Sequence, residues 1–197
     1  LESHRSLRNI TTFQFDRELS NGGRVVAKQS LAIFDREIDT PASRFAGRQL
    51  NSFTEVSYAR PFGGHLLAFG FNAVYDDFRE DRPESFKRDE TRTTFGGFVQ
   101  DTFDVTDRFS IEAGFRLDAV RDYGVFALPR VSLLYHLSDK FAVRATVGFG
   151  YKTPSVFTED AETRLFRNVL PVGNGLKAES SRGGTFDLNY RDSIGEK

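Results

Sequence analysis

The sequence predicts an all-β protein, an antiparallel up-and-down transmembrane β-barrel segment of about nine strands. Three features favour this fold class: strands that alternate apolar and polar residues, aromatic residues at the ends of the apolar rows, and short turns that alternate with longer connections. Successive side chains of a strand point to opposite faces. Such strands suit a barrel with lipid tails on one side, headgroups at the ends and a wet lumen on the other side.

The pattern is clearest at residues 141–152. We expect the first row to face lipid and the second to face the lumen. The first row is Phe141, Val143, Ala145, Val147, Phe149 and Tyr151, and the second is Ala142, Arg144, Thr146, Gly148, Gly150 and Lys152. The same alternation recurs at 67–76, 109–119, 130–137 and 185–190.

The strands are expected, in chain order, at 11–19, 24–34, 45–58, 65–78, 93–103, 109–120, 127–137, 141–152 and 182–191. Short turns are expected at 20–23, 59–64, 104–108 and 138–140, where Gly, Asn, Asp or Pro favour tight reversals. Longer connections are expected at 35–44, 79–92 and 153–181, with 121–126 intermediate. Every second connection of up-and-down strands lies on one side, so we expect the short turns at one rim and the long loops at the other.

The strand 45–58 does not alternate cleanly. Polar Gln49 and Glu55 lie in one row with Phe45 and Phe53. Either these are positions near a rim of the barrel, or the true register differs.

Composition excludes several classes of protein. With 39% hydrophobic and 28% charged residues and no apolar run near 18 residues, no transmembrane helix is expected. The 27 basic and 28 acidic residues leave no charge surplus for binding nucleic acid. The absence of cysteine excludes disulfides and thiolate chemistry.

No catalytic or metal site is predicted. His4, His65 and His136 have no metal-ligand spacing, and no serine lies in the strand–turn–helix context of a nucleophile. We therefore expect neither an enzyme nor a bound cofactor.

Two long segments resemble a known family. Residues 98–116 read FVQDTFDVTDRFSIEAGFR, and residues 129–154 read PRVSLLYHLSDKFAVRATVGFGYKTP. This order of a VQD strand, a TDRF or SDKF turn, a GFRLD strand and a Gly-aromatic strand resembles the barrel of TonB-dependent outer-membrane receptors. NVLP and LKAESSR, at 168–171 and 176–182, resemble the siderophore-receptor-like group common in Bacteroidetes.

The resemblance implies a many-stranded barrel in the lipid of the bacterial outer membrane, with a plug domain inside it. It also implies import of a scarce ligand, such as an iron–siderophore complex, powered through contact with the TonB complex. The sequence shows no plug-like domain, no TonB-contacting box and no aromatic-ended final strand. We therefore expect residues 1–197 to be a partial barrel domain, without the plug and the C-terminal end of the barrel.

Charged residues of the inward rows are expected to face the lumen or the plug. These are Glu112, Arg116, Asp118, Arg144, Lys152 and Asp187. In the connection 153–181, the candidates for ligand contact are Phe157, Phe166 and Arg167. The connection 79–92 contains five acidic and five basic residues and is expected to be a solvated loop.

Two other classes of protein fit the alternation. A small self-contained porin-like or adhesive barrel would need an even number of strands and paired ends. A soluble β-sandwich or ligand-binding barrel would bury its phenylalanine row and dissolve without detergent.

Overall fold

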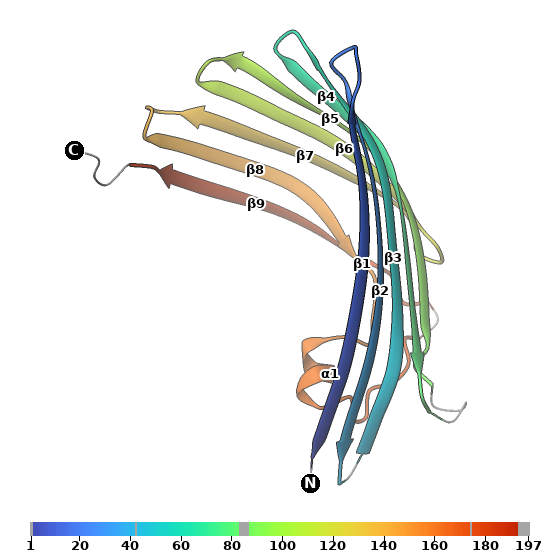
Figure 1. Cartoon of the computed structure of the whole chain (residues 1–197). Coiled ribbons are helices and arrows are strands. Elements are labelled where there is room, and N and C mark those ends of the chain that lie inside the picture. The colour runs from blue at the N-terminus through green and yellow to red at the C-terminus, as the bar shows by residue number, and fades with distance from the viewer. Residues whose placement is uncertain (1, 42, 83–86, 174, 193–197) are drawn as a thin grey trace, which may run out of the picture.

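The structure is a computed structural model that describes residues 2–41, 43–82, 87–173 and 175–192. Within these residues nine strands and one short helix follow one another: β1 (Ser3–Glu18), β2 (Arg24–Thr40), β3 (Ser43–Phe62), β4 (His65–Glu80), β5 (Glu90–Thr106), β6 (Phe109–Val120), β7 (Gly124–His136), β8 (Phe141–Lys152), α1 (Glu159–Thr163) and β9 (Glu179–Tyr190). Each strand pairs antiparallel with its neighbours in the sequence, which confirms the predicted topology (Figure 1). No helix in these ranges is long and apolar enough to cross a membrane.

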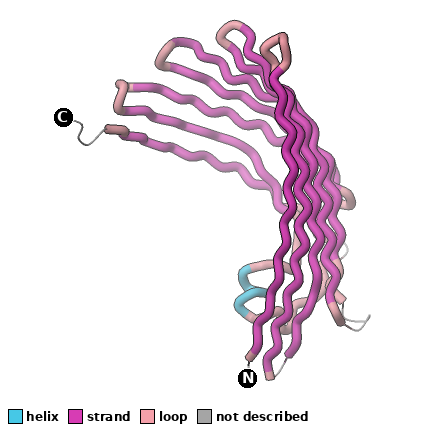
Figure 2. Tube along the Cα trace, in the orientation of Figure 1, coloured by secondary structure: helices cyan, strands magenta, loops and turns pink. Residues whose placement is uncertain are grey.

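The sheet is a curved, open arc (Figures 1 and 2). Its two edges are β1 and β9, and every residue of both strands is exposed. An unpaired backbone N–H or C=O at hydrocarbon depth costs several kcal/mol, on the order of ~2–7. An arc with two bare edges is therefore part of a barrel wall rather than a closed barrel.

The register sorts the side chains onto two faces. On one face, four residues of adjacent strands lie side by side. In order from β4 to β7 they are Phe71, Gly97, Leu117 and Ala127. This outward face carries large exposed apolar side chains, among them Phe71 at 73% and Phe186 at 72% exposure. The other, inward face receives the connection that contains α1. The outward face thus has the character expected of a surface that contacts lipid.

The connections lie at two rims. The turn rim holds 19–23, 63–64, 107–108 and 137–140, and the described residues at the loop rim are 41, 81–82, 87–89, 121–123, 153–173 and 175–178. In outer-membrane barrels the short turns are periplasmic and the long loops are extracellular. The predicted rims are confirmed, but the predicted long loop at 35–44 is wrong, since β2 continues to Thr40 and β3 begins at Ser43. The first strand likewise begins at Ser3 rather than at residue 11.

Cross-strand ion pairs explain why this charged segment is strand. On the outward face, Arg48 Nε lies 2.6 Å from Asp35 Oδ1, and Arg44 Nη2 lies 2.8 Å from Glu37 Oε1. On the inward face, the next residue along β2 from Glu37 is Ile38, which is 1% exposed. Opposite charges on facing strands stabilise the pairing. The β2–β3 hairpin therefore extends past the apolar band while keeping its two faces distinct.

Replacement of Ala145 by arginine tests the outward face. Ala145 lies midway along β8, and Thr146 beside it, on the inward face, pairs with Thr185 of β9. In the intact protein folded into lipid vesicles, we expect Ala145→Arg to lower the free energy of unfolding by about 2–4 kcal/mol. Thr185→Arg is the matched control, and urea unfolding measures both. Equal costs for the two variants would contradict the assignment of the faces.

Candidate functional site

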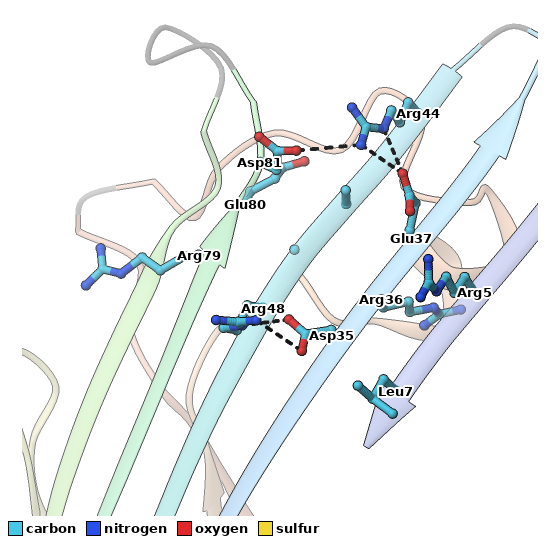
Figure 3. Close-up of a pocket in the computed structure, with 12 residues that line it drawn as sticks. Arg5, Leu7, Asp35, Arg36, Glu37, Arg44, Arg48, Arg79, Glu80 and Asp81 are labelled. Carbon is cyan, nitrogen blue, oxygen red and sulfur yellow. Dashed lines mark hydrogen bonds and ion pairs between the residues drawn. The ribbon is translucent and has the colours of Figure 1, made fainter. Parts of the chain in front are cut away.

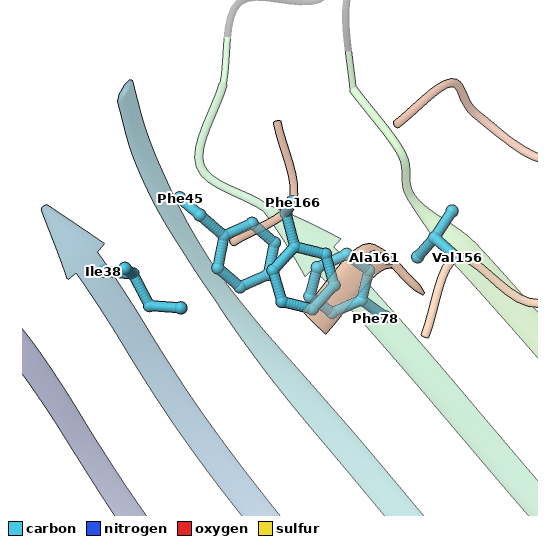
Figure 4. Close-up of a cluster of buried hydrophobic side chains, with 6 residues drawn as sticks. All are labelled: Ile38, Phe45, Phe78, Val156, Ala161 and Phe166. Carbon is cyan, nitrogen blue, oxygen red and sulfur yellow. The ribbon is translucent and has the colours of Figure 1, made fainter. Parts of the chain in front are cut away.

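A long connection folds back onto the inward face at the loop rim. Residues 153–173 and 175–178, here called the docked loop, include α1 and lie on the concave side of the sheet (Figure 1). The Phe166 ring stacks on that of Phe45 of β3, with centroids 4.1 Å apart, and Phe78 of β4 lies beside them (Figure 4). The buried cluster comprises Ile38, Phe45, Phe78, Val156, Ala161 and Phe166. Apolar burial therefore holds the loop against β2, β3 and β4.

The helix of the docked loop is short and ends in a strained turn. Thr158 caps it, because its Oγ1 accepts a hydrogen bond from the Ala161 N–H over 3.2 Å. Directly after α1, Leu165 and Phe166 have φ of 51° and 58°, which is left-handed backbone that costs free energy for such side chains. The complete burial of Phe166 offsets that cost. The sequence pattern predicts no helix here, although Thr158 followed by two acidic residues is typical of a helix N-terminus.

A buried ion pair fixes the docked loop from the neighbouring connection. Arg88 is 1% exposed, and the side chain of Glu80 is fully buried. Arg88 Nε donates to Glu80 Oε2 over 2.9 Å, and its Nη2 also binds that carboxylate. Arg88 Nη1 donates to the carbonyl oxygen of Phe166 over 2.9 Å, and the guanidinium lies over the Phe45 ring. The prediction of a solvated loop at 79–92 is thus wrong for these two residues, and it is also too long, since β4 continues to Glu80 and β5 begins at Glu90.

Two further contacts tie the docked loop to the sheet. The Glu90 carboxylate accepts the Val156 N–H over 2.7 Å at the start of β5. Arg36 Nη1 of β2 lies 2.8 Å from Glu162 Oε1 of α1. Strands from β2 to β5 therefore all contribute to holding the loop.

The structure brings the three ligand-contact candidates together in the docked loop. Phe166 is buried in the cluster, and the half-buried Phe157 packs edge-on against Phe78, with ring centroids 4.8 Å apart. Arg167 is exposed and donates to Thr40 Oγ1 over 2.8 Å and to Ser43 Oγ over 2.9 Å. Of the three side chains, Arg167 is thus the most open to the solvent.

A polar network lies deeper on the inward face, around Gly96. Arg116 Nε donates to Asp118 Oδ1 over 2.7 Å, and its Nη2 donates to Asn72 Oδ1 over 3.1 Å. Tyr151 Oη donates to Asp118 Oδ2 over 3.0 Å. The register places Gly96 between Asn72 and Asp118, and these two side chains fill the space where a β-carbon would lie. The network needs glycine at this position.

The six charged candidates are only partly connected. Among them, Arg116 and Asp118 form the one ion pair in the part of the chain that the structure describes. Arg144 and Asp187 lie directly opposite each other on β8 and β9, and Lys152 lies opposite Glu179. In the same ranges no group of three or more His, Cys, Asp or Glu side chains could hold a metal ion.

Tyr151 corrects the predicted row of β8. It was expected to face lipid, yet its hydroxyl binds Asp118 and its ring stacks on Phe126 with centroids 4.1 Å apart. The pairing of β8 with β7 ends at Gly148. Beyond that point β8 pairs only with β9, where Tyr151 lies opposite Ser180, and the Tyr151 side chain reaches the inward face. The sequence pattern does not reveal that Asn72 and Tyr151 belong to this network, because their partners lie on other strands.

The family model for the TonB-dependent receptor-like β-barrel matches residues 3–195. The chain belongs to this family. The expected location in the bacterial outer membrane is confirmed with it. The family is one of receptors rather than enzymes, and neither a self-contained small barrel nor a soluble β-sandwich is favoured.

Relatives of this chain are much longer. The iron-regulated outer membrane virulence protein of Vibrio cholerae is 25% identical over 149 residues, which are 75% of this chain and 21% of the relative. The siderophore receptor PirA from Pseudomonas aeruginosa has a TM-score of 0.74 at 15% identity, over 98% of this chain and 38% of that one. A mutant of the ferric enterobactin receptor PfeA from Pseudomonas aeruginosa has a TM-score of 0.76 at 14% identity, over 96% and 33%. The chain thus spans about a fifth of the curated relative and shares its fold with about a third of each receptor structure.

Gly96→Ala tests the polar network. The added β-carbon would overlap Asn72 Oδ1 and Asp118 Oδ1 and lie 2.8 Å from Arg116 Nη2. We expect the free energy of unfolding to fall by about 1–3 kcal/mol, as measured by urea denaturation. The control is Gly97→Ala on the outward face, where the nearest atom of the Phe71 ring is 3.4 Å away. A loss as large in the control would contradict this account.

Arg88→Met tests the buried ion pair. The variant leaves the buried Glu80 carboxylate with only the longer contact to Arg82, whose Nε lies 3.4 Å from Glu80 Oε1, so the free energy of unfolding should fall by up to about 3–5 kcal/mol. Hydrogen exchange should accelerate across the docked loop while the paired strands stay protected. Arg164→Met, a change of the exposed arginine after α1, should leave the exchange unchanged. If the docked loop is as well protected in Arg88→Met as in the unchanged protein, the role of this pair is refuted.

Proposed function

We propose that the chain is a wall segment of a TonB-dependent receptor whose full-length form imports an iron–siderophore complex. The observation that carries the proposal is the family match across residues 3–195. The ligand class is supported by similar structures that are a siderophore receptor and a ferric enterobactin receptor, and by the iron-regulated relative.

Each face of the sheet has a part in this proposal. The outward face contacts outer-membrane lipid. The inward row with Arg116 and Asp118 contacts a plug domain of the same full-length chain, and Glu112, Arg144, Lys152 and Asp187 extend that contact. The energy for import comes through the TonB complex, which contacts another part of the receptor. The segment has no catalytic activity and binds no nucleic acid.

The docked loop forms part of the extracellular mouth. Its buried side, with Phe166, is held by Arg88, while Arg167 and Phe157 lie nearer the surface. We assign ligand contact to Arg167 and Phe157 and a supporting role to Phe166. Guanidinium groups suit the oxygen-rich surface of a ferric siderophore.

Uptake of radioactive iron by cells tests the proposal. Cells that produce the full-length receptor should accumulate iron supplied as ferric enterobactin or a ferric hydroxamate siderophore. Uptake should fall to background when the receptor gene is deleted or the proton-motive force is collapsed. Undiminished uptake of every siderophore after deletion would contradict the proposal.

A further inference from the structure

A patch of uncharged polar side chains interrupts the apolar band of the outward face. Gln29 lies on the outward row of β2, and Thr54 of β3 lies directly opposite it. The next outward residue of β3 is Ser52, and two outward residues of β1 continue the patch. The five residues, here called the polar island, are Asn9, Thr11, Gln29, Ser52 and Thr54.

Apolar side chains enclose the polar island. Toward the turn rim lie Phe13 of β1 and Val56 of β3, and toward the loop rim lies Ile33 of β2, all three of them exposed. A strand crosses the bilayer in about 9–11 residues. Thr54 lies within that distance of the end of β3 at Phe62. The polar island therefore lies at the depth of the hydrocarbon.

The other side of the wall has no such patch. The outward rows of β6, from Phe109 to Ala119, and of β7, from Val125 to Leu133, contain no polar side chain. Lipid tails cannot form hydrogen bonds, so an amide and several hydroxyls that face them cost free energy. Polar groups at this depth are favourable where a protein surface covers them and supplies partners.

The polar island satisfies its own hydrogen-bonding groups only in part. Gln29 Nε2 donates to Ser52 Oγ over 3.1 Å, and the Thr54 hydroxyl donates to Gln29 Oε1. The Thr11 hydroxyl donates to Asn9 Oδ1 over 3.5 Å. Within the described residues, Ser52 Oγ and Asn9 Nδ2 donate to no acceptor, and the oxygens of the two threonine hydroxyls accept from no donor. Spare donors and spare acceptors are thus present in one patch.

This combination suits a second copy of the same surface. Two receptors in one membrane have the same orientation, so a two-fold axis along the membrane normal brings their polar islands together at equal height. Nearer the loop rim, acidic and basic side chains are interspersed on the same strands, so two copies do not repel each other there. Figure 3 shows two such pairs, Asp35 with Arg48 and Glu37 with Arg44.

We propose that the outward face of β1, β2 and β3 is the contact surface between two copies of the full-length receptor. The Ser52 and Asn9 donors of each copy bind hydroxyl oxygens of the other. Leu31, which lies between Thr11 and Ser52 in the sheet, packs beside these hydrogen bonds. The remaining outward face stays in contact with lipid. This contact does not depend on which ligand the receptor imports.

Cross-linking in native outer membranes tests the proposal. Residues 1–197 contain no cysteine, so a full-length receptor without other cysteines can carry one at a chosen position. Leu31→Cys should give a product of twice the mass of the receptor with a short bis-maleimide. Leu133→Cys, on the outward row of β7, is the matched control, because both leucines are 41% exposed. It should stay monomeric.

A second set of variants removes the polar groups from the Leu31→Cys receptor. Gln29→Leu combined with Thr54→Val should lower the association constant about tenfold, which corresponds to about 1.4 kcal/mol, with the yield of dimer as the readout. Thr93→Val, on the outward row of β5, should leave the yield unchanged. The heat-dependent shift on gels shows whether a variant is folded. If the double variant loses that shift, Ser52→Ala replaces it and should also lower the yield.

Three outcomes would overturn the proposal. The first is equal cross-linking, or none, at positions 31 and 133. The second is a dimer whose yield is unchanged in the folded variant that lacks the polar groups. The third is a product with the mass of the receptor plus a different protein, which would assign the polar island to another partner.

Discussion

Hydrocarbon offers no partner to a backbone N–H or C=O, and this constraint determines the rest of the structure. The ladder runs without interruption from β1 to β9, and each pairing fixes which side chains share a face. Once the register is set, Phe71 and Leu117 must face outward, while Asn72 and Asp118 must face inward. The polar network around Gly96 and the apolar band are therefore two results of one hydrogen-bonding pattern.

The same strands serve different surroundings along their length. At the level of the apolar band, β3 and β4 have an apolar outward face and a polar inward face. Near the loop rim the outward face carries ion pairs such as Arg48–Asp35, and the inward face becomes apolar around Phe45 and Phe78. The docked loop covers that apolar patch. The polarity of the two faces thus reverses along the strands, and the alternation of side chains is what permits it.

The sequence predicted the fold where one face is uniformly apolar. The rows of β8 from Phe141 to Phe149 needed no tertiary information, because lipid-facing and lumen-facing residues differ strongly in polarity. At 35–44 the prediction failed, since charges on a strand outside the hydrocarbon resemble charges on a loop. Alternation alone could not distinguish a segment of a receptor barrel from a small barrel or a soluble β-sandwich. The family resemblance at 98–116 and 129–154 made that distinction.

The candidate site was less predictable, because its contacts join distant segments. Nothing in the balanced charges of 79–92 shows that Arg88 is buried and its neighbours are not. Its burial depends on Phe166, which lies 78 positions later. Tyr151 departs from its row beyond Gly148, where β8 pairs with β9 alone, and this is a property of the sheet rather than of the strand. Arg116 and Asp118 could be predicted to share the inward face, because both lie on the polar row of one strand.

The contacts of the docked loop differ from those of the sheet in how far apart their partners lie in the sequence. Every strand pairs with its neighbour in the sequence, so the sheet can grow one hairpin at a time with little loss of chain entropy. The Arg36–Glu162 contact is different, because it joins residues 126 positions apart. The pairing of β2 to β8 brings its two sides together, so the contact depends on the arrangement of the whole sheet between them.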